Sequence, residues 1–419
     1  MATPAAAAAT AKKRKKDEKA EKLERRRGHQ EPQLPPGLFP ALRVATVLLV
    51  FGVGYALAES GAFHSEVEGK MSIWARFVFF IAAQSIASEF FAVLLLQAAR
   101  SLLREDARSG FEPTGEEMAV NDSTIPWPDR ELLNEELKGF AHRPGQPFFL
   151  NHVTGKRRFK DACMRFGMTI GSLLAVWFTS AFMDKRTVAS LGLTWSGPFF
   201  LDMALGLLVG VSIVAFMFAV ELSAGWLHFL QFFEVFDRRE SFSACILWDV
   251  IFHLNVSLNE ELPVRGWMLF NIAEAMGKHL GLLGTHAFVA GMVVESLFFV
   301  AMHLASPGGS KLQSILNIFI GGMSGGLNVL LTGGLLGFSL GWHFGWNITM
   351  GNVLGLSTSG IPISATFVSV APHPEKQHLH GGVFGPEGGV VSPAAYLLGV
   401  LLLALLYGWP RGDLAALPG

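Results

Sequence analysis

Three charged side chains lie close together in an otherwise apolar part of the sequence. Glu260, Glu261 and Arg265 all fall within the run NEELPVRGW. A charge buried in lipid is costly, and it tends to persist only where it is paired or functional. Residues four apart share a helix face, so we expect Glu261 and Arg265 to pair. Glu260 is rotated by about 100° on a helix of 3.6 residues per turn, which leaves its carboxylate free to point elsewhere.

Two later apolar segments contain polar pairs at the same spacing. Phe299 and His303 are four residues apart, and so are His343 and Asn347. A carboxylate beside a histidine can hold and deprotonate a water molecule, which is the work of a general base. A second histidine and an asparagine offer N–H donors to a developing oxyanion. Acyl transfer to water needs these two functions, although the spacing fits a buried network that only fastens helices equally well.

The elements that position these residues are predicted to be membrane helices. Hydrophobic residues make up 51% of the 419 residues and charged residues only 16%, whereas soluble domains have about 25% charged residues. A spanning helix needs about 20 mostly apolar residues, and an open sheet edge cannot face lipid. The predicted fold is therefore an all-α, multi-pass transmembrane helical bundle. Its eight or nine candidate spans are residues 38–58, 73–96, 162–183, 198–222, 243–273, 286–304, 312–333, 336–356 and 394–410.

Composition changes along the chain predict six regions. They are a basic, disordered tail (1–37), two transmembrane helices (38–103), a soluble insertion (104–161), the core with the polar motifs (162–356, motifs within 260–347), a polar loop (357–393), and a last transmembrane helix with its tail (394–419). In the insertion, the stretch from Gly145 to Phe159 resembles a degenerate WW-type hairpin. The polar loop contains His373, His378 and His380, and a mobile loop is a better interpretation than a metal site.

Basic residues predict the orientation in the lipid bilayer. Lysine and arginine are dense in the tail and recur in the loops after the second and fourth spans, which favours a cytosolic N-terminus. The net charge of −1 gives no indication of nucleic-acid binding. The sequence leaves open whether the membrane is that of the endoplasmic reticulum or of a plastid, and it leaves the oligomeric state unknown.

Further ionisable residues fall within the predicted spans, and each is a candidate for a functional site. Glu295 stands eight residues before His303, on roughly the same helix face, where it could tune that imidazole or line a water-filled cavity. Asp249 and His253 are further candidates, whereas structural pairing near an interface is the better interpretation for Glu89, Asp202 and Glu221.

The three polar pairs, in this order on successive apolar segments, resemble the motifs of a known family. Glu260 to Arg265 matches EExxxR, Phe299 to His303 matches FxxxH, and His343 to Asn347 matches HxxxN. These are the motifs of the CPBP intramembrane proteases, which include the type II CAAX prenyl endopeptidases. The resemblance covers roughly residues 187–356.

The resemblance implies roles for the motif residues. Glu260 and His303 would activate water, and His343 and Asn347 would line the oxyanion hole. Glu261 and Arg265 would brace the site, with Glu261 assisting catalysis, and Phe299 would give structural support. Glu295 is an addition to the family pattern and is a further candidate for structural support. Pro263 departs from the family pattern and, because it cannot donate to the carbonyl of Asn259, predicts a kink.

Cofactor and substrate stay open at this stage. Glu260, His303 and His343 could supply a zinc set with an open position for water, but a general base made of Glu and His needs no ion, and we favour no tightly held metal. A prenyl-type enzyme would remove the last three residues of a prenylated CaaX protein. The alternatives are a catalytically silent scaffold or protective partner protein, and an ion-coupled transporter. A transporter predicts internal symmetry, and the motif segments do not recur earlier in the chain.

Overall fold

The computed structural model describes residues 48, 51, 72–103, 153–235, 237, 239–306, 308–309 and 311–408. The predicted tail (1–37), nearly all of the first predicted span (38–58) and most of the insertion (104–161) lie outside the described residues. The described part is mostly helical, with one small sheet. The prediction of a helical bundle is therefore confirmed.

Six helical segments are long and apolar enough to cross a membrane. They contain α3 (Ile73–Leu102), α5 (Gly155–Phe178), α6 (Gly197–Ser223), α7 (Phe242–Glu261) joined to α8 (Leu269–Leu280), α9 (Thr285–His303) and α10 (Leu312–Leu331). Two further predicted spans form shorter helices, α11 (Gly337–Ile348) and α13 (Ser392–Tyr407). Single helical turns of π type follow three of the helices: η1 (Thr179–Met183), η3 (Leu262–Met268) and η4 (Thr349–Val353).

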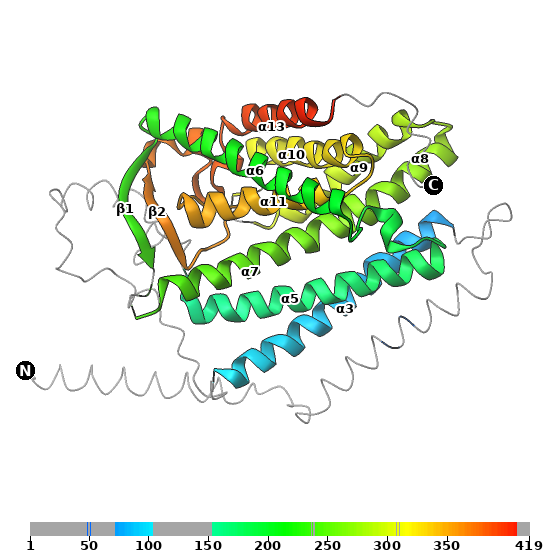
Figure 1. The fold of residues 1–419 in the computed structure, drawn as a ribbon, viewed down its shortest axis with the longest axis horizontal. Helices are drawn as coiled ribbons and strands as arrows, with labels where there is room; N and C mark the ends of the chain where they lie inside the picture. Colours follow the sequence, from blue (N-terminus) through cyan, green and yellow to red (C-terminus); the bar gives the residue numbers. More distant parts are fainter. Residues whose placement is uncertain are drawn as a thin grey trace, which may run out of the picture. The chain divides into compact units, whose positions relative to one another are not determined.

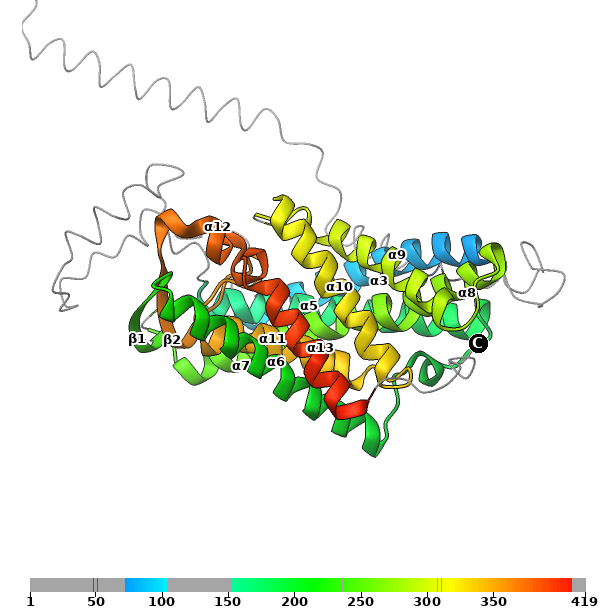
Figure 2. The ribbon, with the colours of Figure 1, turned by 90° about the horizontal axis from the view of Figure 1, so that it is seen from above.

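Helix α11 lies in the interior of the bundle, between α6 and α7 (Figure 1). Helices α3, α5 and α7 pack side by side below α11 in Figure 1, and α9 and α10 lie above it. Helix α9 packs against both α8 and α10 (Figure 2). Helix α13 covers α6 and α10. The three helices with the polar motifs, α7, α9 and α11, thus belong to one packed unit.

Glycines set the close contact between α6 and α11. A Cβ at Gly341 would lie 1.9 Å from the carbonyl oxygen of Met203, and one at Gly206 would lie 2.1 Å from that of Phe338. Small residues let the backbones of membrane helices approach closely. This packing fixes the depth and rotation of α11, which bears His343 and Asn347.

The predicted kink at Pro263 takes the form of a π-helix. Helix α7 passes directly into η3, where the N–H of Leu269 bonds to the carbonyl of Val264, five residues earlier. Proline cannot make the usual bond to the fourth residue before it, so the wider hydrogen-bond pattern begins where Pro263 stands. The chain continues into α8 without a break, and every residue of η3 is buried.

The predicted polar loop at 357–393 is corrected by the structure. It contains strand β2 (Ala365–Pro372), which pairs antiparallel with β1 (Leu227–Val235) in the register Leu227 to Pro372 and Val235 to Ala365. The β-branched and aromatic residues of ATFVSVAP explain the strand. Short helical turns follow, namely η5 (Pro374–Lys376), α12 (Gln377–His380), η6 (Gly382–Phe384) and η7 (Pro386–Gly388). Phe384 and Glu387 in these turns are buried, so the segment is part of the core.

The prediction of a second strand in the WW-type hairpin is also wrong, because residues 155–159 form the start of helix α5. The hydroxyl of Thr154 accepts a hydrogen bond from the N–H of Arg157 at 3.2 Å. The carboxylate of Glu240 accepts the N–H groups of Gly155 and Lys156. These caps satisfy the free donors of the first turn and favour a helix start at this point.

Candidate active site

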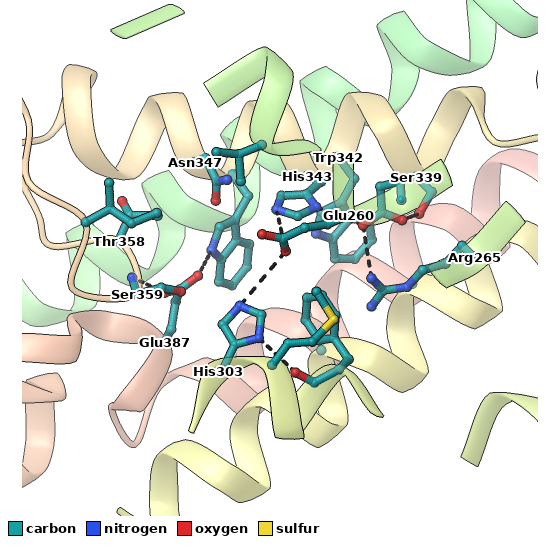
Figure 3. A pocket seen from close by; sticks show the side chains of 18 of the residues that line it. Glu260, Arg265, His303, Ser339, Trp342, His343, Asn347, Thr358, Ser359 and Glu387 are labelled. Carbon is teal, nitrogen blue, oxygen red and sulfur yellow. Dashed lines mark hydrogen bonds and ion pairs between the residues drawn. The ribbon is translucent and has the colours of Figure 1, made fainter. Parts of the chain in front are cut away.

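A cavity of about 260 Å³ lies where the three motif helices meet. Glu260 from α7, His303 from α9, and His343 and Asn347 from α11 all line it. The Glu260 carboxylate lies between the two imidazoles (Figure 3). Its Oε2 atom is 4.0 Å from Nε2 of His303 and 3.9 Å from Nε2 of His343. The structure therefore brings together the acid, both imidazoles and the amide that the sequence singled out.

Hydrogen bonds at the far side of each ring fix how the imidazoles face Glu260. The Nδ1 atom of His303 lies 2.8 Å from the carbonyl oxygen of Phe299, one helical turn earlier. A carbonyl can only accept, so Nδ1 of His303 is the protonated nitrogen. In the neutral ring the lone pair of Nε2 then faces the Glu260 carboxylate. This is the arrangement that a proton-accepting pair requires.

Glu261 is turned away from Glu260 and holds His343. One of its oxygens accepts from Nδ1 of His343 at 2.8 Å, and the other accepts the hydroxyl of Ser339 at 2.6 Å. Arg265 donates to the first oxygen at 3.2 Å, which confirms the pairing predicted from the spacing of four residues. Glu261 is therefore fully engaged in fixing α11 against α7.

Arg265 is buried between two carboxylates and an aromatic ring. Besides Glu261, it faces Glu295, with Nε 3.7 Å from Oε1, which is an ion-pair distance but not a hydrogen bond. Its guanidinium lies 4.0 Å from the centre of the Phe299 ring, which is a cation–π contact. A Cβ at Gly325 would lie 2.8 Å from Nε of Arg265, so the glycine leaves room for the guanidinium in this position.

Glu295 thus belongs to the support of the site. It is fully buried and does not line the cavity, so it neither contacts His303 nor borders water there. Glu295 and His303 are eight residues apart on α9, so their directions differ by only about 80°. Phe299 stands between them in the sequence, and its ring centre lies 4.5 Å from that of His303. This position fits the prediction that Glu295 gives structural support. It does not fit the suggestions that Glu295 tunes the His303 imidazole or lines a water-filled cavity.

Asn347 lies one turn after His343 and is buried, with its side chain at the cavity (Figure 3). Its side-chain amide makes no hydrogen bond to another described residue of the chain. An amide at a cavity wall without a protein partner is available to a ligand there.

Sequence reasoning missed one wall of the cavity, which comes from the segment after α11. Glu387 accepts the indole N–H of Trp346 at 2.8 Å. Its other oxygen accepts both the backbone N–H and the hydroxyl of Ser359, at 2.5 and 2.6 Å. Glu387 therefore fixes the turn at 358–361 against α11 (Figure 3). Its only signal in the sequence was an acidic residue in a Gly-rich stretch, PEGG.

The other ionisable candidates lie away from the cavity. Asp249 forms a buried ion pair with Arg158 and accepts from Asn352 and Ser364, so it ties α5 and α7 to the start of β2. Asp202 accepts the hydroxyl of Tyr407 at 2.5 Å. His253 and Glu221 are fully buried, and Glu89 is exposed on α3. None of these residues lines the cavity.

The histidines of the predicted loop do not form a metal site. His380 is buried, its Nε2 donates to the carbonyl of His373 at 2.9 Å, and its Nδ1 accepts the N–H of Gly382. Burial lowers the pKa of the His380 side chain. Both ring nitrogens are thus occupied, and the histidine closes a turn.

The distances between the donor atoms at Glu260 are longer than those around a bound zinc ion. Ligand atoms about 2.0–2.2 Å from a tetrahedral zinc lie roughly 3.3–3.5 Å from one another. The distances of 3.9 and 4.0 Å at Glu260 exceed this spacing. Within the described ranges, no group of three or more His, Cys, Asp or Glu side chains is arranged to hold a metal ion. As they stand, the residues do not fit the ion.

Comparison with known proteins finds one family to which the motif helices are similar. Residues 242–349 match the family described as type II CAAX prenyl endopeptidase Rce1-like. This stretch runs from the start of α7 to the end of α11 and includes all three motifs. The resemblance to the CPBP proteases is thereby confirmed for this part of the chain. No curated protein and no solved structure matches the chain.

Proposed function

We propose that this chain is an intramembrane endopeptidase in which Glu260 and His303 activate the water that attacks a peptide bond. The observation that carries the proposal is the convergence of one carboxylate oxygen and two imidazole nitrogens, within 4.0 Å, in a cavity of an Rce1-like membrane domain. CAAX proteolysis is the activity of that family, and the six helices long and apolar enough to cross a membrane support an integral membrane protein.

The gap between Glu260 and His303 suits a bridging water. At 4.0 Å the two atoms are too far apart for a direct hydrogen bond. A water about 2.8 Å from each would donate its two protons to the carboxylate and to Nε2 of His303. Its lone pairs would then face the cavity and the carbonyl carbon of the substrate. Glu260 takes the proton as the oxygen attacks, which is general-base catalysis, and gives it to the amide nitrogen as the C–N bond breaks and the amine leaves.

The opposite wall supplies donors to the oxyanion. His343 already donates from Nδ1 to Glu261, so a second proton on Nε2 gives an imidazolium that donates into the cavity. The carboxylates of Glu260 and Glu261 on either side stabilise that charge. The amide N–H of Asn347, one turn further along α11, is the second donor. Glu261 and Arg265 act as positioning residues, because Glu261 holds His343 and Ser339 and Arg265 pairs with Glu261.

The proposed substrate is a prenylated CaaX sequence, from which the last three residues are released. The prenyl chain would approach from the lipid, and the peptide would enter from the cytosolic side, consistent with a cytosolic N-terminus. The proposed compartment is the endoplasmic reticulum or a plastid membrane, where the substrate would meet the enzyme.

His303→Ala tests the water-activating pair. We expect cleavage of a prenylated CaaX peptide by the purified protein to fall by about 10²–10⁴-fold, the usual contribution of a general base. Mass spectrometry of the released tripeptide measures this loss and locates the cut. His286→Ala is the matched control, because His286 is exposed at the start of α9, outside the cavity. Retention of full activity by His303→Ala would exclude the mechanism.

Metal removal gives an independent test. Because the three donors are spaced too widely for zinc, we expect a chelator titration to leave cleavage unchanged and elemental analysis to find less than one metal ion per chain. Stoichiometric zinc that is lost together with activity, and restored with it, would show that the site contracts around an ion.

A further inference from the structure

The cavity is lined by a second asparagine, which none of the three motifs includes. Asn328, on α10, lines the cavity and is 2% exposed. Its Oδ1 has no exposed surface and no hydrogen-bond partner, and its Nδ2, which is not fully enclosed, bonds to no described residue either. A buried amide that makes no hydrogen bond costs free energy. The Nδ2 group of Asn328 is therefore a donor that a ligand in the cavity can satisfy.

Comparison with the other asparagines sets this residue apart. Every asparagine in the described part of the chain is buried. Most have side-chain amides that hydrogen-bond within the protein and do not line the cavity, namely Asn255, Asn259, Asn271, Asn317 and Asn352. The side-chain amides of Asn328 and Asn347 bond to no described residue, and both residues line the cavity. Among the described asparagines, the lack of a protein partner thus coincides with a position at the cavity.

Helix α10 presents Asn328 to the cavity on a face that otherwise consists of glycine. The residues of α10 that line the cavity are Gly321, Gly325 and Asn328, and their spacing of four and three puts them on one side of the helix. A Cβ at Gly321 would lie 2.8 Å from the hydroxyl oxygen of Tyr396, and one at Gly325 would lie against Arg265. The glycines therefore leave room for side chains from other helices, and Asn328 is the polar side chain that α10 itself contributes.

Asn328 and Asn347 lie at opposite ends of the cavity. Asn328 is near the end of α10 and Ser339 is near the start of α11, on either side of the short connection between these helices, so both lie at one end. In Figure 3, Ser339 and Asn347 lie on opposite sides of Glu260. His343 is halfway between these two residues on α11, about 6 Å from each along the helix axis. This is the length of about two residues of an extended peptide.

We propose that the Nδ2 group of Asn328 donates a hydrogen bond to a backbone carbonyl of the bound peptide, about two residues from the bond that is cut. This inference rests on the proposed function and specifies how the site holds its substrate. Every residue of a peptide has a backbone carbonyl, so the contact fixes the position of the chain and is indifferent to its side chains. With Asn347 at the oxyanion, the peptide is held on both sides of Glu260.

Asn328→Leu tests the contact, because leucine fills similar space but cannot donate a hydrogen bond. We expect the KM for a prenylated CaaX peptide to rise roughly five- to tenfold, the usual effect of one hydrogen bond, while kcat stays near the wild-type value. The unfolding temperature should not fall, because the substitution removes a buried amide without a partner. Asn328→Gln keeps an amide and should recover part of the KM. A purely structural role would instead lower kcat and the unfolding temperature together.

Gln313→Leu is the matched control, since Gln313 is a half-buried amide of the same helix that does not line the cavity. Its KM should equal that of the wild type. An Asn328→Leu protein with the wild-type KM would overturn the peptide contact and leave the protease intact.

A single-atom change in the substrate identifies the group that Asn328 contacts. Replacing one backbone C=O by C=S keeps the N–H and the planar geometry but leaves a poor acceptor. In a series of such peptides, altered at successive positions outside the bond that is cut, one should raise the KM of the wild-type protein to that of Asn328→Leu. Asn328→Leu should have no further effect on this peptide, because both changes remove the same hydrogen bond. Effects that add at every position would overturn the proposal.

A binding measurement separates this inference from the chemistry. Glu260→Gln protein should bind a fluorescent prenylated peptide, and the added substitution Asn328→Leu should weaken this binding by the same factor as the rise in KM. Such a loss of binding, together with no cleavage by the wild type, would remove the proposed protease and keep the peptide contact. Equal binding with and without Asn328→Leu, or no binding at all, would remove the contact itself.

Discussion

Glu260→Gln should abolish peptide cleavage while the protein stays folded. Glutamine keeps the size and shape of the side chain but cannot accept the proton from water, so we expect a loss of about 10²–10⁴-fold or more. Stability should change little, because the Glu260 carboxylate faces the cavity and makes no hydrogen bond to any described residue. The measurement is turnover of a prenylated CaaX peptide, together with thermal unfolding of the same preparation.

Glu375→Gln is the matched control for this substitution. Glu375 is exposed in the short turn η5 and lies outside the cavity, so its replacement should leave turnover at the wild-type level. A Glu260→Gln protein that cleaves normally would identify the chain as a protease without this base. If the wild type and both variants leave every prenylated peptide intact, the scaffold alternative becomes the better description.

Arg265→Met should be the most destabilising single change at the site. The arginine is 2% exposed and lies between Glu261 and Glu295, so its loss leaves two carboxylates buried without their cation. Removing one partner of a buried ion pair typically costs about 3–5 kcal/mol. Methionine fills similar space, so the effect reports charge more than volume. Retention of monodisperse protein after heating in detergent measures the change.

Arg157→Met provides the comparison for charge loss on an exposed surface, where a change within about 0.5 kcal/mol is expected. Adding Glu295→Gln to Arg265→Met should recover part of the loss, because it removes one of the two buried carboxylates. An Arg265→Met protein as heat-resistant as the wild type would show that the neighbouring carboxyl groups are protonated and need no counter-ion.

The spacing of the motif residues predicted one pair of the candidate site, and the resemblance of the three motifs to the CPBP family grouped the other residues. Positions four apart on a helix must share a face, so the Glu261–Arg265 pair followed from the sequence alone and is confirmed. The opposite direction of Glu260 followed from the same helical geometry. The long apolar runs predicted the spanning helices, because hydrophobic length is the main signal of a membrane segment.

The parts that could not be predicted depend on contacts distant in sequence. Glu387 reaches Trp346 across 41 positions, and nothing local to PEGG indicates that partner. The strand at 365–372 forms its hydrogen bonds with β1, which precedes it by more than 100 residues. Because that partner is distant in the sequence, the short apolar run was predicted to be part of a loop. Thr154 and Glu240 similarly turn a hairpin-like stretch into the first turn of α5. In each case a partner from elsewhere overrode the local pattern.

The wall that Glu387 fixes has a consequence for how the protein is made. The three motifs are complete once the ribosome has added Asn347, yet the turn at 358–361 is fixed only after Glu387 and the sheet partner at 365–372 have followed. A nascent chain therefore holds its reactive carboxylate before it holds the enclosure around it. A fragment that stops at the family match would retain every motif residue and still lack the wall that Glu387 fixes.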